Sequence, residues 1–263
     1  KIDILKEGNL IIAGEGKAES IDEDLVINAK KFEYEKDKKT IKAFNGIAYF
    51  KSNNLKIQFD EIISNQLTQI TTAKNNVKIF DLNKNLSIET KLVNFNKKDN
   101  VLESPTPSTI KDKINNILKT NSFHYNLNDE ILKLQNAKLK DVYNNNFSIE
   151  IAYLNTASNE LIGKDIIVNL DNKSFNEGNQ PRIKGRSIEY NKNEAVITKG
   201  VFTTCKKTDK CPPWQLSAEK VQHNPKKQII NYKNAFLKVY DVPIMYFPKF
   251  FHPDPTVKRQ SGF

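Results

Sequence analysis

Few residues in this chain have types that could carry chemistry, and the clearest are two cysteines, Cys205 and Cys211. As metal ligands they would need two further partners, yet the histidines stand in unrelated positions, at His124, His223 and His252. We therefore expect neither a metal ion nor a cofactor. In an oxidising compartment the two thiols could bond to each other or to cysteines outside this chain, so we predict a disulfide, with free thiols as the alternative.

Motifs of catalytic sites are absent from the sequence. It contains no Gly-x-Ser-x-Gly and no His-Glu-x-x-His, and Gly14-Glu-Gly16 is not followed by a phosphate-loop pattern. The acidic residues Asp22, Glu23 and Asp24 lie in a predicted turn, which we interpret as a solvated loop. A carboxylate pair for glycoside cleavage is not recognisable in a single sequence. We expect no enzymatic activity, and keep a stacked-strand carbohydrate-active enzyme or adhesin module as the alternative.

The elements that must position these residues form a β-type unit that recurs about seven times, at intervals of about 30 to 35 residues. Each unit opens with a strand of alternating apolar and polar residues, such as Leu25–Ala29 or Leu55–Phe59. Two shorter strands follow, and Asn45-Gly46 predicts a hairpin turn between them because both residues accept a positive φ. Lys111–Thr120 fits a helical turn and a plain strand equally well. A period of this length is typical of stacked architectures, so we predict an all-β fold.

Alternation places apolar side chains on one face of each opening strand. We expect this face to line an interior that is apolar throughout, while Lys, Asn and Glu face water. The candidate lining residues are Leu25, Ile27, Leu55, Ile57, Phe59, Ile88, Phe123, Phe147, Ile149, Ile151, Ile188 and Leu216.

The proline content marks a second segment at the end of the chain. Prolines are sparse in the middle of the sequence and crowd its end, so we place regular strand stacking in residues 1–240 and an extended, stiffened exit segment in residues 241–263. The candidate functional residues of this segment are Pro243, Tyr246 and Pro248. Its aromatic side chains fit a core position and a belt at a membrane interface equally well.

The chain carries a net charge of +10, with 38 Lys, 3 Arg and 31 acidic residues, and it holds 33 Asn. A basic surface favours anionic partners, but an A+T-rich genome also enriches Lys and Asn together, and we favour that explanation. No Lys/Arg run is dense enough for a nucleic-acid arm, so we expect no nucleic-acid partner. No apolar run approaches the ~18 residues of a transmembrane helix, and the start at Lys1 is compatible with a removed targeting peptide.

Three stretches near the C-terminus form recognisable motifs. They are Cys211-Pro-Pro-Trp-Gln-Leu-Ser-Ala, Ala235-Phe-Leu-Lys-Val-Tyr-Asp-Val-Pro-Ile-Met-Tyr-Phe-Pro and Lys258-Arg-Gln-Ser-Gly-Phe. These stretches resemble the LptD (OstA) family of LPS-assembly proteins. In that family a Trp-x-h-x-Ala strand, a Val-Pro-h-h-Tyr-h-Pro segment and an Arg-Arg-Ser-Gly-Phe signature close the periplasmic domain and lead into an outer-membrane barrel. The earlier repeats resemble the OstA-like units of the same pathway.

The resemblance implies a stacked, partly open β-jelly roll at the periplasmic face of the outer membrane of a Gram-negative bacterium. Its apolar groove would take lipopolysaccharide (LPS) from the bridge protein LptA and pass it to a barrel, plugged by the lipoprotein LptE, for surface assembly. That barrel would follow Phe263. Family cysteines often lie near the N-terminus and at the end of the jelly roll, each bonded to barrel cysteines. Here both fall within Cys205–Cys211, which leaves the pairing open.

An apolar groove can hold a lipid without covalent chemistry, because burying acyl chains is worth about 0.8 kcal/mol per CH2 group. The first unit would also present an unpaired strand edge, to which a partner can add a strand. We therefore place the docking edge for an LptA-like bridge protein in residues 1–30.

Overall fold

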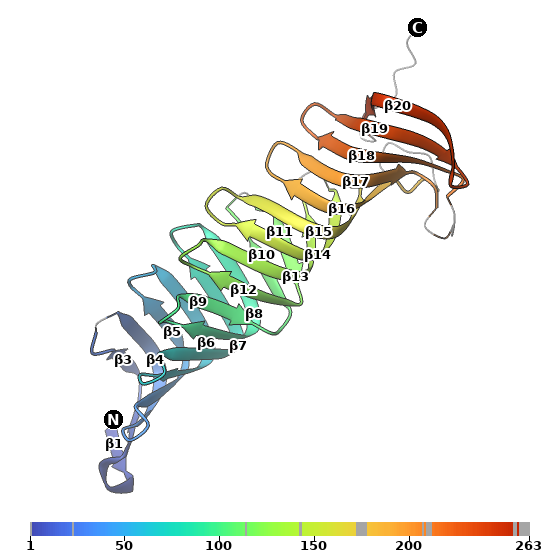
Figure 1. Ribbon diagram of the computed structural model, residues 1–263. Coiled ribbons are helices and arrows are strands. Elements are labelled where there is room, and N and C mark those ends of the chain that lie inside the picture. Colours follow the sequence, from blue (N-terminus) through green and yellow to red (C-terminus); the bar gives the residue numbers. More distant parts are fainter. Residues whose placement is uncertain are drawn as a thin grey trace. The chain divides into compact units, whose positions relative to one another are not determined.

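Figure 1 shows a chain built almost entirely of β-strands. This computed structural model describes residues 2–22, 24–113, 115–141, 144–171, 178–206, 208, 212–254 and 257. Within those ranges there are twenty strands and one short 3-10 turn, η1 (Lys6–Gly8), and the strand pairings are antiparallel. The all-β prediction is confirmed. Among the described residues, no helix is long and apolar enough to cross a membrane.

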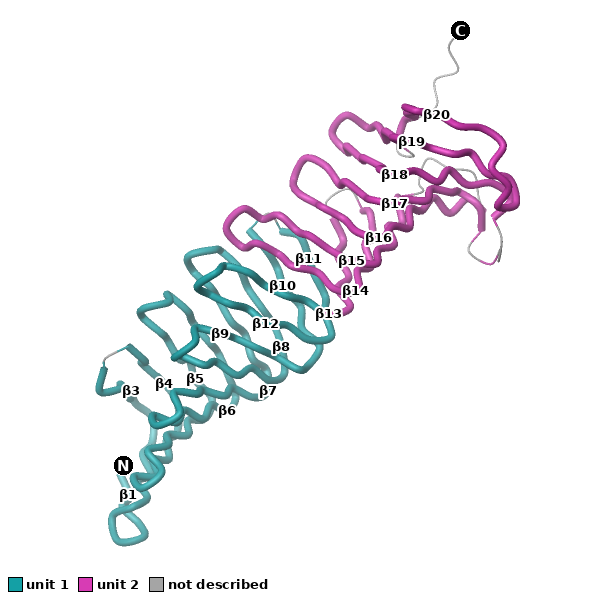
Figure 2. The backbone as a smooth tube through the Cα atoms, in the orientation of Figure 1, with its two compact units in different colours: residues 1–134 teal, residues 135–263 magenta. Residues whose placement is uncertain are grey.

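The chain divides into two compact units, unit 1 of residues 1–134 and unit 2 of residues 135–263 (Figure 2). The division into residues 1–240 and 241–263 stays a prediction. The strands are β1 (Ile2–Leu5), β2 (Leu10–Ala13), β3 (Gly16–Glu19), β4 (Leu25–Glu35), β5 (Thr40–Phe50), β6 (Leu55–Asn65), β7 (Ile70–Asp81), β8 (Leu86–Asn96), β9 (Val101–Ser104), β10 (Ser108–Lys111), β11 (Ile117–Thr120), β12 (Ser122–Asn126), β13 (Ile131–Lys140), β14 (Asn146–Asn155), β15 (Glu160–Asn169), β16 (Arg182–Tyr190), β17 (Ala195–Thr203), β18 (Trp214–Asn224), β19 (Ile229–Val239) and β20 (Val242–Pro253).

Four-residue turns join the long strands of unit 1. Strands β4 to β9 form an antiparallel meander, with turns at 36–39, 51–54, 66–69, 82–85 and 97–100. The last residue of each turn has a φ between 46° and 57°, and three of these five are Asn. Asn also precedes turns: the Oδ1 atom of Asn65 accepts hydrogen bonds from the backbone N–H groups of Leu67 and Thr68, each at 2.9 Å. Both roles favour Asn, so its abundance has a use in the fold.

The expected hairpin turn at Asn45-Gly46 is wrong. Thr40–Phe50 is one continuous strand, and Asn45 lies in its middle with a φ of 52°. Asn accepts this conformation at a mid-strand irregularity as readily as in a turn. Gly46 is required there by close approach, because a Cβ atom at this position would lie 2.2 Å from the backbone oxygen of Asn28. Asn75 and Asn76 make the equivalent irregularity in β7.

These irregularities change which side chains face the interior. In β6 the buried residues before the register shift are Leu55, Ile57 and Phe59, and those after it are Ile62 and Ser64. The even spacing of two breaks between Phe59 and Ile62, so both halves of the strand turn their apolar side chains inward. A strictly alternating reading from the sequence misses this change of phase.

Unit 2 repeats the arrangement. Strands β14 to β20 form a second antiparallel meander, with positive φ at Asp165, Lys199 and Asn234 in the middle of β15, β17 and β19. The start of the expected exit segment is the strand β20, which pairs with β19 along its length. Its prolines fit an edge strand, where a missing N–H group costs no ladder bond. In unit 1, the ambiguous stretch Lys111–Thr120 contains the end of β10 and all of β11, which pair with each other.

Candidate functional site

The candidate lining residues lie inside the two units. In unit 1, Leu25, Ile27, Leu55, Ile57, Phe59, Ile88 and Phe123 are buried, and in unit 2 Phe147, Ile149, Ile188 and Leu216 are buried. Ile151 is only half-buried, because β14 changes phase beside it and turns Ala152 and Leu154 inward instead. Ile57 and Leu55 have no solvent exposure at all. The interior of unit 1 is therefore mostly apolar and closely covered, but it is not apolar throughout, because Ser64, Thr71 and Asp81 are also buried.

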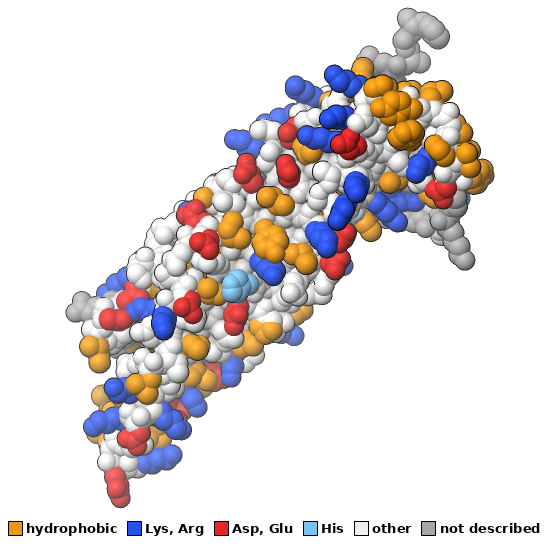
Figure 3. Space-filling model, viewed as in Figure 1, with side chains coloured by type: hydrophobic (Ala, Val, Ile, Leu, Met, Phe, Trp, Pro, Cys, Tyr) orange, Lys and Arg blue, Asp and Glu red, His pale blue; other side chains and the backbone are white. Residues whose placement is uncertain are grey.

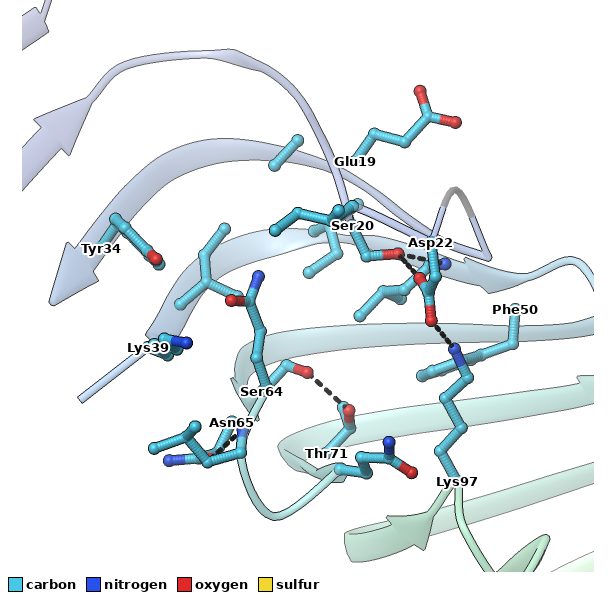
Figure 4. Close-up of a pocket in the computed structure, with 18 residues that line it drawn as sticks. Glu19, Ser20, Asp22, Tyr34, Lys39, Phe50, Ser64, Asn65, Thr71 and Lys97 are labelled. Carbon is cyan, nitrogen blue, oxygen red and sulfur yellow. Dashed lines mark hydrogen bonds and ion pairs between the residues drawn. The ribbon is translucent and has the colours of Figure 1, made fainter. Parts of the chain in front are cut away.

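A cavity of about 550 Å³ opens at the first strands of unit 1 (Figure 4). Leu25 and Ile27 contribute to its apolar lining together with Ile41 and Phe50, which the sequence analysis did not single out. Polar residues line it as well, namely Glu19, Ser20, Asp22, Lys39, Ser64, Asn65, Gln66, Gln69, Thr71 and Lys97. Apolar and polar groups are mixed in this lining, since buried Ser64 and Thr71 lie in it together with buried Ile27 and Phe50. A mixed lining of this kind suits an amphiphile.

Two rows of turns, one at each end of the strands, border the interior of unit 1. The first row consists of turns 36–39, 66–69, 97–100 and 127–130, and the second row of the turn before β4 and turns 51–54 and 82–85. Backbone hydrogen bonds run along each row, for example from Gln66 N to Lys39 O at 3.0 Å and from Lys51 N to Asp24 O at 3.0 Å. We call the line where the two rows meet the seam.

The contacts that cross the seam are between side chains. Lys97 of the first row pairs with Asp22 and, at 3.0 Å, with Asp24 of the second row. The Nδ2 atom of Asn53 donates to Oδ1 of Asn100 at 3.4 Å. Further along, Lys84 pairs with Glu130. Lys39 of the first-row turn 36–39 and Gln66, Leu67 and Gln69 of turn 66–69 line the cavity. The seam therefore opens into the cavity at this end, and we call this opening the mouth.

The ion pairs at the mouth shift the pKa values of their groups. A hydrogen bond from Lys97, helped by one from Ser20, lowers the pKa of Asp22 to about 2. Burial opposes ionisation of Asp24, but hydrogen bonds from Ser52 and Lys97 outweigh it, so the pKa of Asp24 is also below its ordinary value. Burial likewise lowers the pKa of Lys97, yet its two carboxylate partners raise it overall. Asp22 and Asp24 thus form a latch on Lys97 instead of lying free in a solvated loop, and Glu23 lies outside the described residues.

The three histidines do not form one cluster, although His223 and His252 lie on one face of unit 2 and both interact with Asp254. His124 is exposed, 3.8 Å from Glu103, whereas His223 is buried in unit 2 against Asp254. His252 accepts or donates a hydrogen bond with Tyr232 at 2.8 Å, and burial lowers its pKa. Within the described ranges, no group of three His, Cys, Asp or Glu side chains is arranged to hold a metal ion.

The cysteines are only partly visible. Cys205 is half-buried, with its Sγ atom 3.6 Å from the backbone oxygen of Trp214, and its own carbonyl accepts a hydrogen bond from Arg182. Cys211 and the stretch from Lys258 to Phe263 lie outside the described residues, so the disulfide stays a prediction.

The N-terminal edge of unit 1 is made by short strands. β1 pairs with β2, and β2 and β3 each pair with part of β4. The side chains of Ile2, Ile4 and Leu5 on β1 are 69%, 65% and 47% exposed. Residues 1–30 therefore contain an exposed apolar edge strand.

Together these features define an antiparallel β-protein with an apolar interior and, in unit 1, a polar seam that ends in a cavity. No family model matches the chain. The LPS-assembly protein LptD of Pseudomonas fluorescens is 31% identical over 85 residues, which are 31% of this chain and 9% of that protein. The chain thus has an LptD-like region and spans only a small part of that relative.

Proposed function

We propose that the chain is a non-enzymatic lipid conduit that holds the acyl chains of LPS and passes LPS toward the outer membrane. The observation that carries this proposal is the covered apolar interior of unit 1, reached through a cavity at the end of a seam. Local similarity to an LPS-assembly protein supports LPS as the lipid.

The seam supports a route for an amphiphile. The backbone hydrogen bonds at the turns run along each row, whereas Lys97, Asn53 and Lys84 hold the rows together through side chains. Opening the seam would break these contacts while leaving the strand ladders intact. Acyl chains would then contact the apolar side chains that contact one another in the closed interior. The charged sugar head would stay in water. Because Ile57 is fully covered, acyl chains enter only when the seam opens.

The remaining roles follow from the same proposal. An LptA-like bridge protein would add a strand at the exposed β1 edge. The region of Pro243, Tyr246 and Pro248 would form the exit toward a barrel with an LptE-like partner, and Cys205 and Cys211 would form disulfides at the periplasmic face of the outer membrane.

Photo-crosslinking in cells tests the proposal. A photoreactive residue at Ile57, Phe59, Ile149 or Ile188 should capture LPS, because these side chains face the interior. Lys56 and Glu150 neighbour two of these positions on the opposite face and serve as matched controls. Capture only at Lys56 or Glu150 would refute the conduit and favour a surface-binding role, such as that of a carbohydrate-active enzyme or adhesin.

A further inference from the structure

The outer face of unit 2 carries a row of lysines that the conduit does not use. Strand register places Lys220 of β18 opposite Lys233 of β19, and Lys233 opposite Lys249 of β20. All three side chains are exposed, and within the described residues no ion pair to them is found. Like charges directly opposite each other destabilise a sheet. The stability of the fold therefore gives no reason for this row of lysines, and we look for its reason in a binding partner.

The row continues across the neighbouring strands. Lys220 lies opposite Thr198, Thr198 opposite Ser187, and Ser187 opposite Lys164, with a hydrogen bond between the two hydroxyl groups. A hollow of about 580 Å³ is lined by these four residues together with Arg186, Lys199, Glu219 and Lys233. Glu219 is its one acidic side chain, and it accepts a hydrogen bond from Asn234 at 2.5 Å. The hollow thus presents ammonium, guanidinium and hydroxyl groups suited to phosphate.

The two units differ in net charge because unit 2 has fewer Asp and Glu residues than unit 1. Residues 135–263 hold 20 Lys and Arg against 12 Asp and Glu, whereas residues 1–134 hold 21 against 19. A genome-wide bias toward Lys would act on both units alike. It does not account for the scarcity of acids in unit 2, so the basic row is a local property of this unit.

Exposed aromatic rings flank the lysine row. Phe236 and Tyr246 pack with ring centroids 4.9 Å apart and are 42% and 49% exposed, and Phe251 is 65% exposed. Phe251 is two residues from Lys249 in the same strand, so the two side chains share a face. Figure 3 shows apolar side chains gathered beside Lys and Arg side chains at the β19–β20 end of unit 2. Rings and ammonium groups on one surface are typical of proteins that lie on a membrane interface.

We infer that this face of unit 2 docks on an anionic lipid surface. Lys220, Lys233 and Lys249 contact the lipid phosphates, and the rings of Phe236, Tyr246 and Phe251 sit among the headgroups. The charge complementarity and the adjoining rings favour a lipid surface over a nucleic acid, for which the face offers a single arginine. The inference does not depend on LPS transport.

Vesicle sedimentation of the chain tests the inference. Vesicles of phosphatidylcholine with phosphatidylglycerol should bind the chain, and vesicles of phosphatidylcholine alone should not. Each neutralised lysine should lower the affinity about fivefold, so the triple variant Lys220→Gln/Lys233→Gln/Lys249→Gln should bind about a hundredfold more weakly. The matched control is Lys30→Gln/Lys91→Gln/Lys98→Gln, which removes the same charge from exposed positions in unit 1. Phe251→Ser should weaken binding without any change of charge.

Three outcomes would overturn the inference: equal loss in both triple variants, equal binding to neutral vesicles, or displacement by inorganic phosphate beyond that by chloride at equal ionic strength. The last result would show a site for a free anion instead of a surface. Urea unfolding supplies a second measurement, because removing opposed like charges should leave the triple variant at least as stable as wild type. A less stable triple variant would show that the row has a structural role.

Discussion

Replacing Lys97 by Ala should loosen the mouth of unit 1. The Lys97 side chain is 27% exposed, and its partners Asp22 and Asp24 are 59% and 12% exposed. Exposed pairs contribute about 0.2–1 kcal/mol, and the pair with Asp24 belongs at the upper end because it is shielded from solvent. The two pairs together are worth about 1–2 kcal/mol, so Lys97→Ala should shift the closed-to-open equilibrium of the mouth by a factor of about 5 to 30.

Electron–electron distance measurements can detect this shift. Spin-labelled noncanonical residues at Ile21 and Lys98, which are exposed on the two rows, report the width of the mouth and leave both cysteines unchanged. Wild type should give one short distance, and Lys97→Ala a broader distribution with a longer component. The charge-swapped variant Lys97→Asp/Asp22→Lys/Asp24→Asn should restore the short distance, because Asp24→Asn removes the carboxylate that would repel the introduced one.

Lys78→Ala is the control for this experiment. It removes a surface ion pair to Glu89, 3.1 Å long, that joins neighbouring strands and does not cross the seam. Its distance distribution should match that of wild type. Identical distributions in wild type and Lys97→Ala would refute the latch, and so would equal broadening in Lys78→Ala, since the effect would then come from general loosening.

Other single substitutions test the latch, the buried interior and the strand irregularities one at a time. Ile57→Asp should cost several kcal/mol in urea unfolding, because the site is fully buried and the carboxylate would have to be desolvated or protonated; a small cost would show that water already reaches Ile57. Gly46→Ala should cost about 1–3 kcal/mol because its Cβ atom meets the backbone of β4, whereas Gly16→Ala has open space and should change little. The pKa of Asp22 is lowered from 3.8 to about 2, so its ion pair stabilises the fold above about pH 4 and is lost as the pH falls through about 2. Asp22→Asn should remove the loss of stability that acid unfolding shows as Asp22 is protonated. The same acid-unfolding curve in wild type and variant would contradict the ion pair between Asp22 and Lys97.

The sequence predicted the all-β class but divided long strands such as β5 into shorter ones. Alternation at Leu55, Ile57 and Phe59 is a local signal, and burial follows it directly. The phase change after Phe59 was missed, because the positive φ that permits a mid-strand irregularity has the same preference for Asn and Gly as a hairpin turn. Pro243 and Pro248 predict an extended exit segment, but they lie in the strand β20, because a sequence does not show on which side of a sheet a strand has no neighbour.

The latch and the lysine row were missed for a different reason. Asp22 and Lys97 are 75 residues apart, and Lys164 and Lys249 come together on one row only through the register of every strand between them. A shift of one residue at any strand would move a side chain to the other face. Such long-range coincidences follow from the three-dimensional register and not from any local pattern.

The contacts across the seam do not follow one spacing along the chain. Asn53 meets Asn100 and Lys84 meets Glu130, at separations of 47 and 46 residues, whereas Asp22 meets Lys97 across 75 residues. Two successive second-row turns, the turn before β4 and turn 51–54, therefore contact the same first-row turn, 97–100. Turns 36–39 and 66–69 contribute lining residues to the cavity instead. The mouth thus lies beside the first-row turns that precede the one held by Lys97.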